Sequence, residues 1–319
     1  MSRFPQRVTE LMQGARIADI LSHAQQVPVT IDADLNAAQA SGVLAKHAIS
    51  SAPVRSKDGG FCGMFDFGDL AELLICGMQN NPKPLASDQN IDALLESGLS
   101  MSSPVHLVSD LSKRNPLVAV KDTESVLDAV NVLVDRSIHR LCVFDEAGTF
   151  VGMLSFSDVL KFLHANMPAI DEFAQATVDS LGLATKRVAT ICGDRPVVDA
   201  LRIMVDRKVS SVAVVDEVDG RLLTAITLTD CKNLVKMRRL EHMRLDCREF
   251  AAQIRARQAL DNLHGSEAFP FFAVHRETTL KSVIAKLVAV RAHRLFVVDD
   301  GKPVSVISIS DIVLALAHK

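Results

Sequence analysis

The pattern of hydrophobic and polar positions repeats four times along the chain. In each copy an apolar, β-rich stretch is followed, after a polar turn, by a second apolar stretch that ends in an aspartate. The four endings are GMFDFGD (Gly63 to Asp69), GMLSFSD (Gly152 to Asp158), TAITLTD (Thr224 to Asp230) and SVISISD (Ser305 to Asp311). Their aspartates lie roughly 70 to 90 residues apart, at the scale of a repeated supersecondary unit. We therefore expect four copies of one unit.

A segment with helical spacing precedes each pair of strands. Val126, Ala129, Val130 and Leu133 recur at intervals of three and four residues, so they line one face of a helix. The third and fourth copies show the same spacing, and the first shows it most weakly. Another apolar stretch typical of a helix follows each aspartate. The predicted unit is strand, helix, strand, strand, helix, which places the chain in the α+β class, built of α/β repeats.

This unit resembles the cystathionine β-synthase (CBS) domain. The resemblance rests on the [Ser/Thr]-x-[Ser/Thr]-Asp ending of three copies and on the His-Arg-Leu runs that begin at His139 and His293. It implies four CBS domains, arranged as two tandem CBS-pair (Bateman) modules in a disc-like body, with ligand clefts between the members of each pair. A chain with four such domains and no catalytic domain is most similar to the gamma subunit of AMP-activated or sucrose-nonfermenting-type protein kinases.

The predicted domains follow the repeats. Residues 15–78 form repeat 1, residues 105–167 repeat 2, residues 180–240 repeat 3 and residues 264–319 repeat 4; residues 79–104 link the first two repeats, and residues 1–14 form a leading segment. The leading segment is amphipathic and carries Glu10, so we expect a helix that packs on the first repeat and not a transit peptide. An arginine-rich helix, Met237 to Leu263, is predicted between repeats 3 and 4, with a solvated face favoured over an anion site.

The composition narrows the class of protein. Hydrophobic residues make up 48% of the 319 residues and charged residues 23%, which is typical of a globular protein with sizeable cores. The formal net charge of −3 gives no reason to expect nucleic acid or a membrane as a partner. We expect a cytoplasmic protein, with the nucleus as a second location. The six cysteines contain no C-x-x-C pair and are predicted to be small buried hydrophobic residues.

An aspartate at the start of a helix can serve a ligand or the helix itself. Its carboxylate offers two acceptor oxygens to the vicinal hydroxyls of a ribose, and the CBS resemblance implies that role for Asp69, Asp158, Asp230 and Asp311. The alternative is structural: Ser157, Thr229 or Ser310 caps the helix and the aspartate complements its positive end. The residues alone leave this choice open, and the repeated resemblance favours ribose.

Phosphate groups need positive charge and fixed donors. The pairs His139-Arg140 and His293-Arg294 stand before the second strand of repeats 2 and 4, where the gamma subunits direct such a pair at nucleotide phosphates; arginine can meet two phosphate oxygens at once. The hydroxyls of Ser155, Thr227 and Ser308 are expected to add ribose or phosphate contacts. The complete set of residues predicted to bind a nucleotide is His139, Arg140, Ser155, Asp158, Arg195, Ser210, Thr227, Asp230, His293, Arg294, Ser308, Asp311 and Asp69.

Repeat 1 departs from this pattern. It has Ser50-Ser51 where the kinase gamma subunits have a phosphate-clamping arginine, and Asp66 replaces the first hydroxyl of the motif. We therefore expect repeat 1 to bind an anionic nucleotide poorly or not at all. The set of occupied clefts is expected to differ from that of the mammalian subunits.

Catalysis finds no support, because the sequence has no Walker-type loop, no H-E-x-x-H and no G-x-S-x-G. The leading hypothesis is a non-catalytic regulatory subunit that binds AMP, ADP or ATP and regulates a serine/threonine kinase, with alpha-type catalytic and beta-type scaffold subunits as partners. No metal or required cofactor is expected. The alternative is a stand-alone four-CBS interaction protein that regulates a phosphatase or a metabolic enzyme, with weak or no nucleotide binding. A homodimer is left open.

Overall fold

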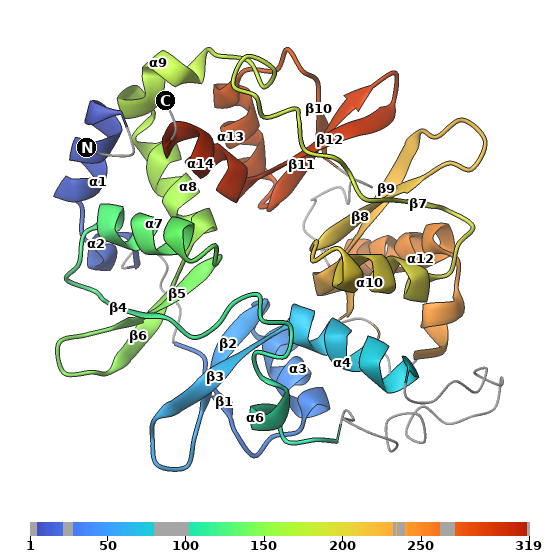
Figure 1. Cartoon of the computed structure of the whole chain (residues 1–319), viewed down its shortest axis with the longest axis horizontal. Coiled ribbons are helices and arrows are strands. Elements are labelled where there is room, and N and C mark those ends of the chain that lie inside the picture. Colours follow the sequence, from blue (N-terminus) through green and yellow to red (C-terminus); the bar gives the residue numbers. More distant parts are fainter. Residues whose placement is uncertain are drawn as a thin grey trace. The chain divides into compact units, whose positions relative to one another are not determined.

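Four three-stranded sheets form the framework of the part of the chain that the structure describes (Figure 1). The computed structural model describes residues 5–21, 28–79, 102–231, 234, 240–261 and 272–317. In each sheet the first strand pairs in parallel with the second, and the second pairs antiparallel with the third. The parallel pair needs a crossover connection, and a helix supplies it in every copy.

The four repeats share this order of elements. Repeat 1 contains β1 (Ile31–Asp32), α3 (Ala37–Lys46), β2 (Ser51–Arg55), β3 (Phe61–Asp66) and α4 (Phe67–Gln79). Repeat 2 contains β4 (Ala119–Lys121), α7 (Val126–Asp135), β5 (Arg140–Phe144), β6 (Phe150–Ser155) and α8 (Phe156–Ala165). Repeat 3 contains β7 (Thr190–Cys192), α10 (Val197–Asp206), β8 (Ser211–Val215), β9 (Leu222–Thr227) and the 3-10 turn η3 (Leu228–Asp230). Repeat 4 contains β10 (Ala273–Val274), α13 (Leu280–Ala289), β11 (Arg294–Asp299), β12 (Lys302–Ser308) and α14 (Ile309–Ala317).

The apolar periodicity of the sequence explains these elements. In α7 the predicted face of Val126, Ala129, Val130 and Leu133 is fully buried, and the helix starts at Ser125, whose hydroxyl accepts the backbone N–H of Asp128 at 3.1 Å. In the apolar runs of repeat 3, β8 is buried at every residue but its last, and β9 is buried at every second residue. The predicted order of strand, helix, strand, strand, helix is confirmed, although most of the helix predicted after Asp230 lies outside the described residues.

A left-handed turn leads from the first helix of each repeat to its second strand. Ala48, Ser137, Lys208 and Arg291 occupy the same place in the four turns, with φ of 54°, 52°, 51° and 51°. The next backbone N–H then reaches back to the helix, as from Ile138 to the carbonyl of Leu133 at 3.1 Å. In repeats 2 and 4 this turn sets the direction in which the chain enters β5 and β11, which begin at Arg140 and Arg294.

The leading helix packs on repeat 2, so the prediction that it packs on the first repeat is wrong. Val8 and Met12 of α1 (Gln6–Gly14) are fully buried in the same apolar cluster as α7 and α8. The following α2 (Ile17–Leu21) is fixed by hydrogen bonds from the N–H of Ile17 to Glu124 and from the N–H of Ala18 to Asp122, both at 3.0 Å. Nearness in sequence misled the prediction, because an amphipathic stretch packs wherever a matching apolar face is offered.

Three other connecting segments behave in the same way. The segment with α6 (Val105–Val108), which the sequence prediction placed at the start of repeat 2, lies on repeat 1, where the N–H of Val105 donates to the carbonyl of Leu35 at 2.7 Å. The segment around Val178, which precedes repeat 3, lies on repeat 4, and its N–H donates to Thr278 at 2.9 Å. The segment that leads into α12 (Cys247–Asp261), before repeat 4, lies on repeat 3 through Leu245. We call these four the exchanged segments, because each packs on the other repeat of its tandem pair.

The described chain divides into two compact units. The first unit comprises the described residues within 1–28, 117–188 and 272–319, which hold repeats 2 and 4. The second comprises those within 29–116 and 189–271, which hold repeats 1 and 3. Each unit has its own apolar core. In the first, α8 contacts α13 and α14; in the second, α4 contacts α10 (Figure 1). Each compact unit therefore combines one repeat from each predicted tandem pair.

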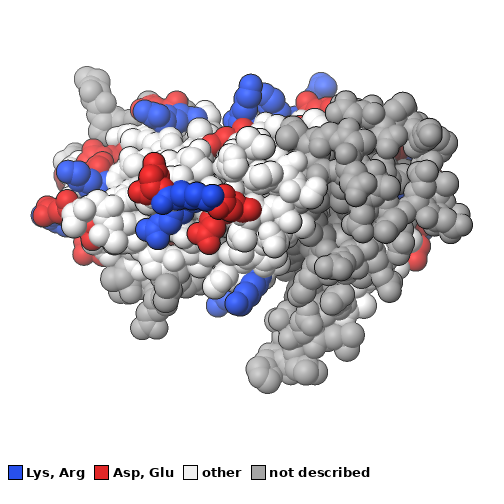
Figure 2. Space-filling view, turned by 90° about the horizontal axis from the view of Figure 1, so that it is seen from below, with Lys and Arg blue, Asp and Glu red and all other residues white. Residues whose placement is uncertain are grey.

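The surface and the cysteines complete the description. On the face drawn in Figure 2, basic and acidic side chains of the described residues lie interspersed. Cys142, Cys231 and Cys247 are buried as predicted, Cys76 is half-buried, and Cys62 and Cys192 are exposed, contrary to the prediction. Among the described residues no helix is both long and apolar enough to span a bilayer.

Candidate functional site

The motif aspartates of repeats 2, 3 and 4 each use one carboxylate oxygen to accept hydrogen bonds from the residue that caps the N-terminus of their helix. Oδ2 of Asp158 accepts the backbone N–H of Ser155 at 3.0 Å and its hydroxyl at 2.7 Å. Asp230 bonds Thr227 in the same way, and Asp311 bonds Ser308. The structural alternative named the wrong cap: the N-cap is the first hydroxyl residue of each motif, three positions before the aspartate, and not Ser157, Thr229 or Ser310. The reason is that each second helix starts directly after the third strand.

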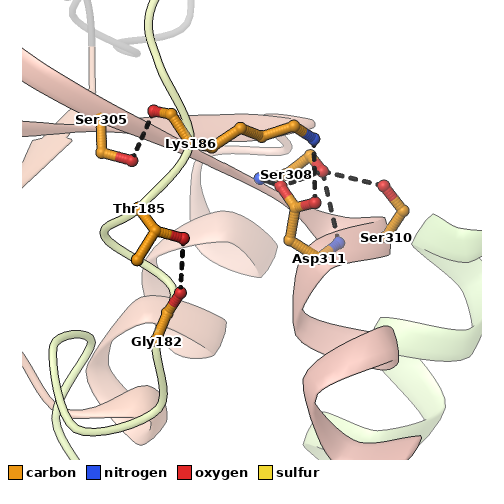
Figure 3. A network of polar contacts seen from close by, with 7 residues as sticks. All are labelled: Gly182, Thr185, Lys186, Ser305, Ser308, Ser310 and Asp311. Atoms are coloured by element: carbon orange, nitrogen blue, oxygen red, sulfur yellow. Dashed lines mark hydrogen bonds and ion pairs between the residues drawn. The ribbon is translucent and has the colours of Figure 1, made fainter. Parts of the chain in front are cut away.

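The other oxygen of Asp158 and of Asp311 lies beside a lysine. Oδ1 of Asp158 lies 3.4 Å from Nζ of Lys161 on the same helix. Oδ1 of Asp311 lies 3.0 Å from Nζ of Lys186, which comes from an exchanged segment (Figure 3). In repeat 3 Arg255 of α12 interacts electrostatically with Asp230. A ribose would therefore have to compete with, or bind beside, a cation that the protein itself supplies.

The motif aspartate of repeat 1, Asp69, is buried, and both of its carboxylate oxygens accept backbone hydrogen bonds. Asp69 is 2% exposed, its Oδ2 accepts the N–H of Asp66 at 2.9 Å, and its Oδ1 accepts the N–H of Ser112 at 2.8 Å. Burial, and then the negative charge of Asp66, raise the pKa of Asp69 to about 8. Asp66 itself takes the place of the N-cap hydroxyl, since its Oδ1 accepts the N–H groups of Gly68 and Asp69. Ribose binding by Asp69 stays a prediction, and these contacts favour a structural role.

The sequence analysis did not identify Arg114 and Asn115, which make further polar contacts around the buried aspartates of repeat 1. Asn115 donates from Nδ2 to Oδ2 of Asp66 at 2.7 Å, and Arg114 donates to the carbonyls of Lys208 at 2.8 Å and Val209 at 3.1 Å in repeat 3. Burial lowers the pKa of Arg114, and the carboxylates of Asp66, Glu72 and Asp69 oppose that shift. The signal that could have pointed to them is Asp66, because a carboxylate in place of a cap hydroxyl has more acceptor sites and needs more hydrogen-bond donors.

The first unit brings basic residues of repeats 2 and 4 together around His293. Its Nδ1 lies 3.2 Å from the hydroxyl of Ser157, across the two repeats. The pKa of His293 is lowered, first by loss of water around the ring and then by the positive charges of Arg294, Arg140 and Lys161; Asp158 opposes the shift. We call Arg140, Lys161, His293 and Arg294 the basic cluster. Several cations whose charges act on one another in this way are suited to an anion.

The predicted site residues fall into both units. His139, Arg140, Ser155, Asp158, His293, Arg294, Ser308 and Asp311 lie in the first unit, and Asp69, Arg195, Ser210, Thr227 and Asp230 lie in the second. His139 is exposed, and its ring meets the edge of Phe156 at 6.1 Å between centroids. Arg195 pairs with Asp199 at 2.7 Å at the start of α10. The members of a tandem pair, repeats 1 and 2 or repeats 3 and 4, belong to different units. The ligand clefts between them therefore stay a prediction. Within the described ranges no cluster of three or more His, Cys, Asp or Glu residues is arranged to hold a metal.

Comparison with known proteins identifies the repeats. The CBS domain family matches residues 17–76, 108–165, 178–236 and 267–318, well over half of the chain. The crystal structure of protein MJ1225 from Methanocaldococcus jannaschii, described as a candidate archaeal homologue of γ-AMPK, matches with a TM-score of 0.69. It is 16% identical and the match covers 94% of this chain and 99% of that one, so it bears on the fold alone. The predicted CBS fold is confirmed, and this stretch of chain consists of non-catalytic CBS domains.

The curated relatives correct the predicted subfamily. Protein sds23 of Aspergillus niger is 34% identical over 251 residues, covering 76% of this chain and 48% of the relative. Protein SDS23 of Eremothecium gossypii is 28% identical over 286 residues, covering 85% and 57%. The chain thus spans about half the length of the curated relatives it matches. The predicted kinship with kinase gamma subunits, and with it the kinase α- and β-type partners, is therefore wrong.

CBS domains of other proteins have been solved with adenine nucleotides. PAE2072 from Pyrobaculum aerophilum was solved with AMP, and the CBS domain of a bacterial CNNM/CorC Mg²⁺ transporter with ATP. Their TM-scores of 0.36 and 0.35 are too low to place a ligand on this chain.

Proposed function

This chain belongs to the CBS domain family, and from that premise we propose that it is a non-catalytic regulator of a protein phosphatase. Its similarity to SDS23 proteins supports the second hypothesis drawn from the sequence, regulation of a phosphatase or a metabolic enzyme. The proposed location is the cytoplasm, with the nucleus as a second compartment.

The proposed regulatory ligand is an adenine nucleotide, and the basic cluster of the first unit is the observation that carries it. The pKa of His293 is lowered by burial and by the positive charges of Arg294, Arg140 and Lys161. A bound phosphate would relieve this repulsion, and charge-assisted hydrogen bonds from arginine to phosphate are strong. Asp158 and Asp311, which lie in the first turns of the helices after β6 and β12, would then face the sugar.

Calorimetric titration of the chain with AMP, ADP and ATP tests the ligand. We expect saturable binding that weakens at least tenfold in the Arg140→Met/Arg294→Met double variant, because both guanidinium groups are lost. Arg136→Met removes an exposed arginine of the same unit and serves as the matched control. Unchanged affinity in the double variant would overturn the assignment to the basic cluster.

The partner is tested separately, with purified serine/threonine phosphatase catalytic subunits. We expect the chain to bind one of them and change its activity, and a nucleotide to alter that affinity, since a ligand shifts an equilibrium only through differential binding. No change in the activity of any phosphatase would overturn this part of the proposal.

A further inference from the structure

Lys186 differs from an ordinary surface lysine because its backbone is fixed. Its carbonyl accepts the hydroxyl of Ser305 at 2.8 Å, and Ser305 is fully buried in β12 (Figure 3). The exchanged segment that carries Lys186 is also tied to repeat 4 at Val178, Asp179 and Ala176 through backbone hydrogen bonds of 2.9 to 3.0 Å. Lys186 is therefore delivered to repeat 4 by the chain that leads into repeat 3.

The ammonium group of Lys186 forms an ion pair with Oδ1 of Asp311, the carboxylate oxygen that does not cap the helix. Oδ2 of Asp311 is already committed to the N–H of Ser308 at 2.8 Å and to its hydroxyl at 2.6 Å. Oδ1 lies 3.0 Å from Nζ of Lys186. The Asp311 side chain is 19% exposed and that of Lys186 59%, so the pair opens to solvent on the lysine side. A sugar diol that uses Asp311 must reach Oδ1, where Lys186 stands.

The other repeats show two different solutions at the same position. In repeat 1 the exchanged segment places the backbone N–H of Ser112 on Oδ1 of Asp69, which a ligand cannot displace without moving the chain. In repeat 2 Lys161 belongs to the helix of Asp158 itself and lies at 3.4 Å, so it is not held by a second segment. Lys186 is intermediate: its backbone is fixed by the exchanged segment, but its side chain can rotate away.

We propose, on the basis of the nucleotide binding proposed above, that Lys186 is a specificity-determining residue that selects anionic nucleotides over neutral nucleosides. A neutral diol that takes Oδ1 of Asp311 leaves the ammonium group without its partner. A nucleotide offers a phosphate to the same ammonium group, so the lost ion pair is replaced by a charge-assisted hydrogen bond. An exposed ion pair is weak, so such an exchange is feasible.

Equilibrium dialysis with adenosine, AMP and ATP on the whole chain tests this. In Lys186→Met we expect tighter binding of adenosine, because Oδ1 is released, and weaker binding of ATP, because a cation is lost. The ratio of adenosine to ATP dissociation constants should fall at least tenfold. Lys302→Met removes an exposed lysine at the start of β12 in the same repeat and should leave the ratio unchanged.

The outcomes separate this inference from the function on which it rests. If the wild-type chain binds ATP and the ratio is the same in Lys186→Met, the role of Lys186 is overturned and nucleotide binding stands. If neither the wild type nor the variant binds any of the three ligands, both proposals are overturned. A fall in the ratio with Lys302→Met equal to that with Lys186→Met would show a general effect of charge and would also overturn the specific role.

Discussion

A single aspartate has different surroundings in the four repeats, although the local sequence is nearly the same. Asp158, Asp230 and Asp311 each cap a helix with one oxygen, and in Asp158 and Asp311 the other oxygen lies beside a lysine. Asp69 is instead buried against Asp66 and the backbone of Ser112. The motif predicted where these carboxylates stand. It could not predict Ser112 and Lys186 as second partners of Asp69 and Asp311, because these two residues lie in segments far away in the sequence.

The pH dependence of stability should report the burial of Asp69. Its pKa of about 8 in the folded chain lies above the ordinary value of 3.8, so its contribution to stability is fully present below pH ~4 and is lost as pH rises through 8. The slope approaches about 1.4 kcal/mol per pH unit. Asp69→Asn lacks this loss, but its amide has only one acceptor oxygen for two N–H donors. The variant should be less stable than wild type at pH 5, and the gap should narrow towards pH 8.

Urea unfolding at pH 5, 6, 7 and 8 measures this gap. Asp34→Asn alters an exposed carboxylate paired with Lys57 in the same repeat and serves as the control. Parallel pH curves for wild type and Asp69→Asn would contradict a raised pKa at this position.

At the scale of elements, the turn after the first helix shows what periodicity cannot reveal. The apolar spacing predicted α3, α7, α10 and α13. It gave no sign that Ala48, Ser137, Lys208 and Arg291 adopt positive φ, because none of them is glycine. The connection between helix and strand requires that conformation for its backbone hydrogen bonds, and it overrides the preference of the side chain.

Replacing Ala48 by glycine should therefore stabilise the chain. A β-carbon in the left-handed conformation costs about 1–2 kcal/mol, and the greater freedom of glycine in the unfolded chain returns part of that. We expect a gain of about 0.5–1 kcal/mol in the free energy of unfolding, measured with urea. Ala45→Gly, three residues earlier in the last turn of α3, should instead destabilise the chain, by up to about 1 kcal/mol. Destabilisation by both substitutions would show that the turn relaxes without cost.

At the scale of the whole chain, the order of repeats in the sequence does not give the cores. Four similar units and their approximate limits can be read from the repeated pattern. The apolar faces of the helices do not reveal their partners, since α8 packs with α13 and α14 and α4 with α10. For the same reason the leading helix was assigned to the wrong repeat. Side chains that match in shape and apolar character decide these contacts, and sequence spacing does not record them.

Two separate cores predict two regions of local stability. Met12 of α1 and Met204 of α10 are both fully buried, the first in the core of repeats 2 and 4 and the second in that of repeats 1 and 3. Either methionine replaced by alanine should cost about 2–5 kcal/mol through lost contacts and a cavity. Because the effect of a cavity is carried by packed neighbours, hydrogen exchange should rise in α7 and α8 for Met12→Ala and in α4 and α10 for Met204→Ala. Mass spectrometry of deuterated peptides resolves these helices, and the same exchange pattern in both variants would mean that the two cores unfold as one.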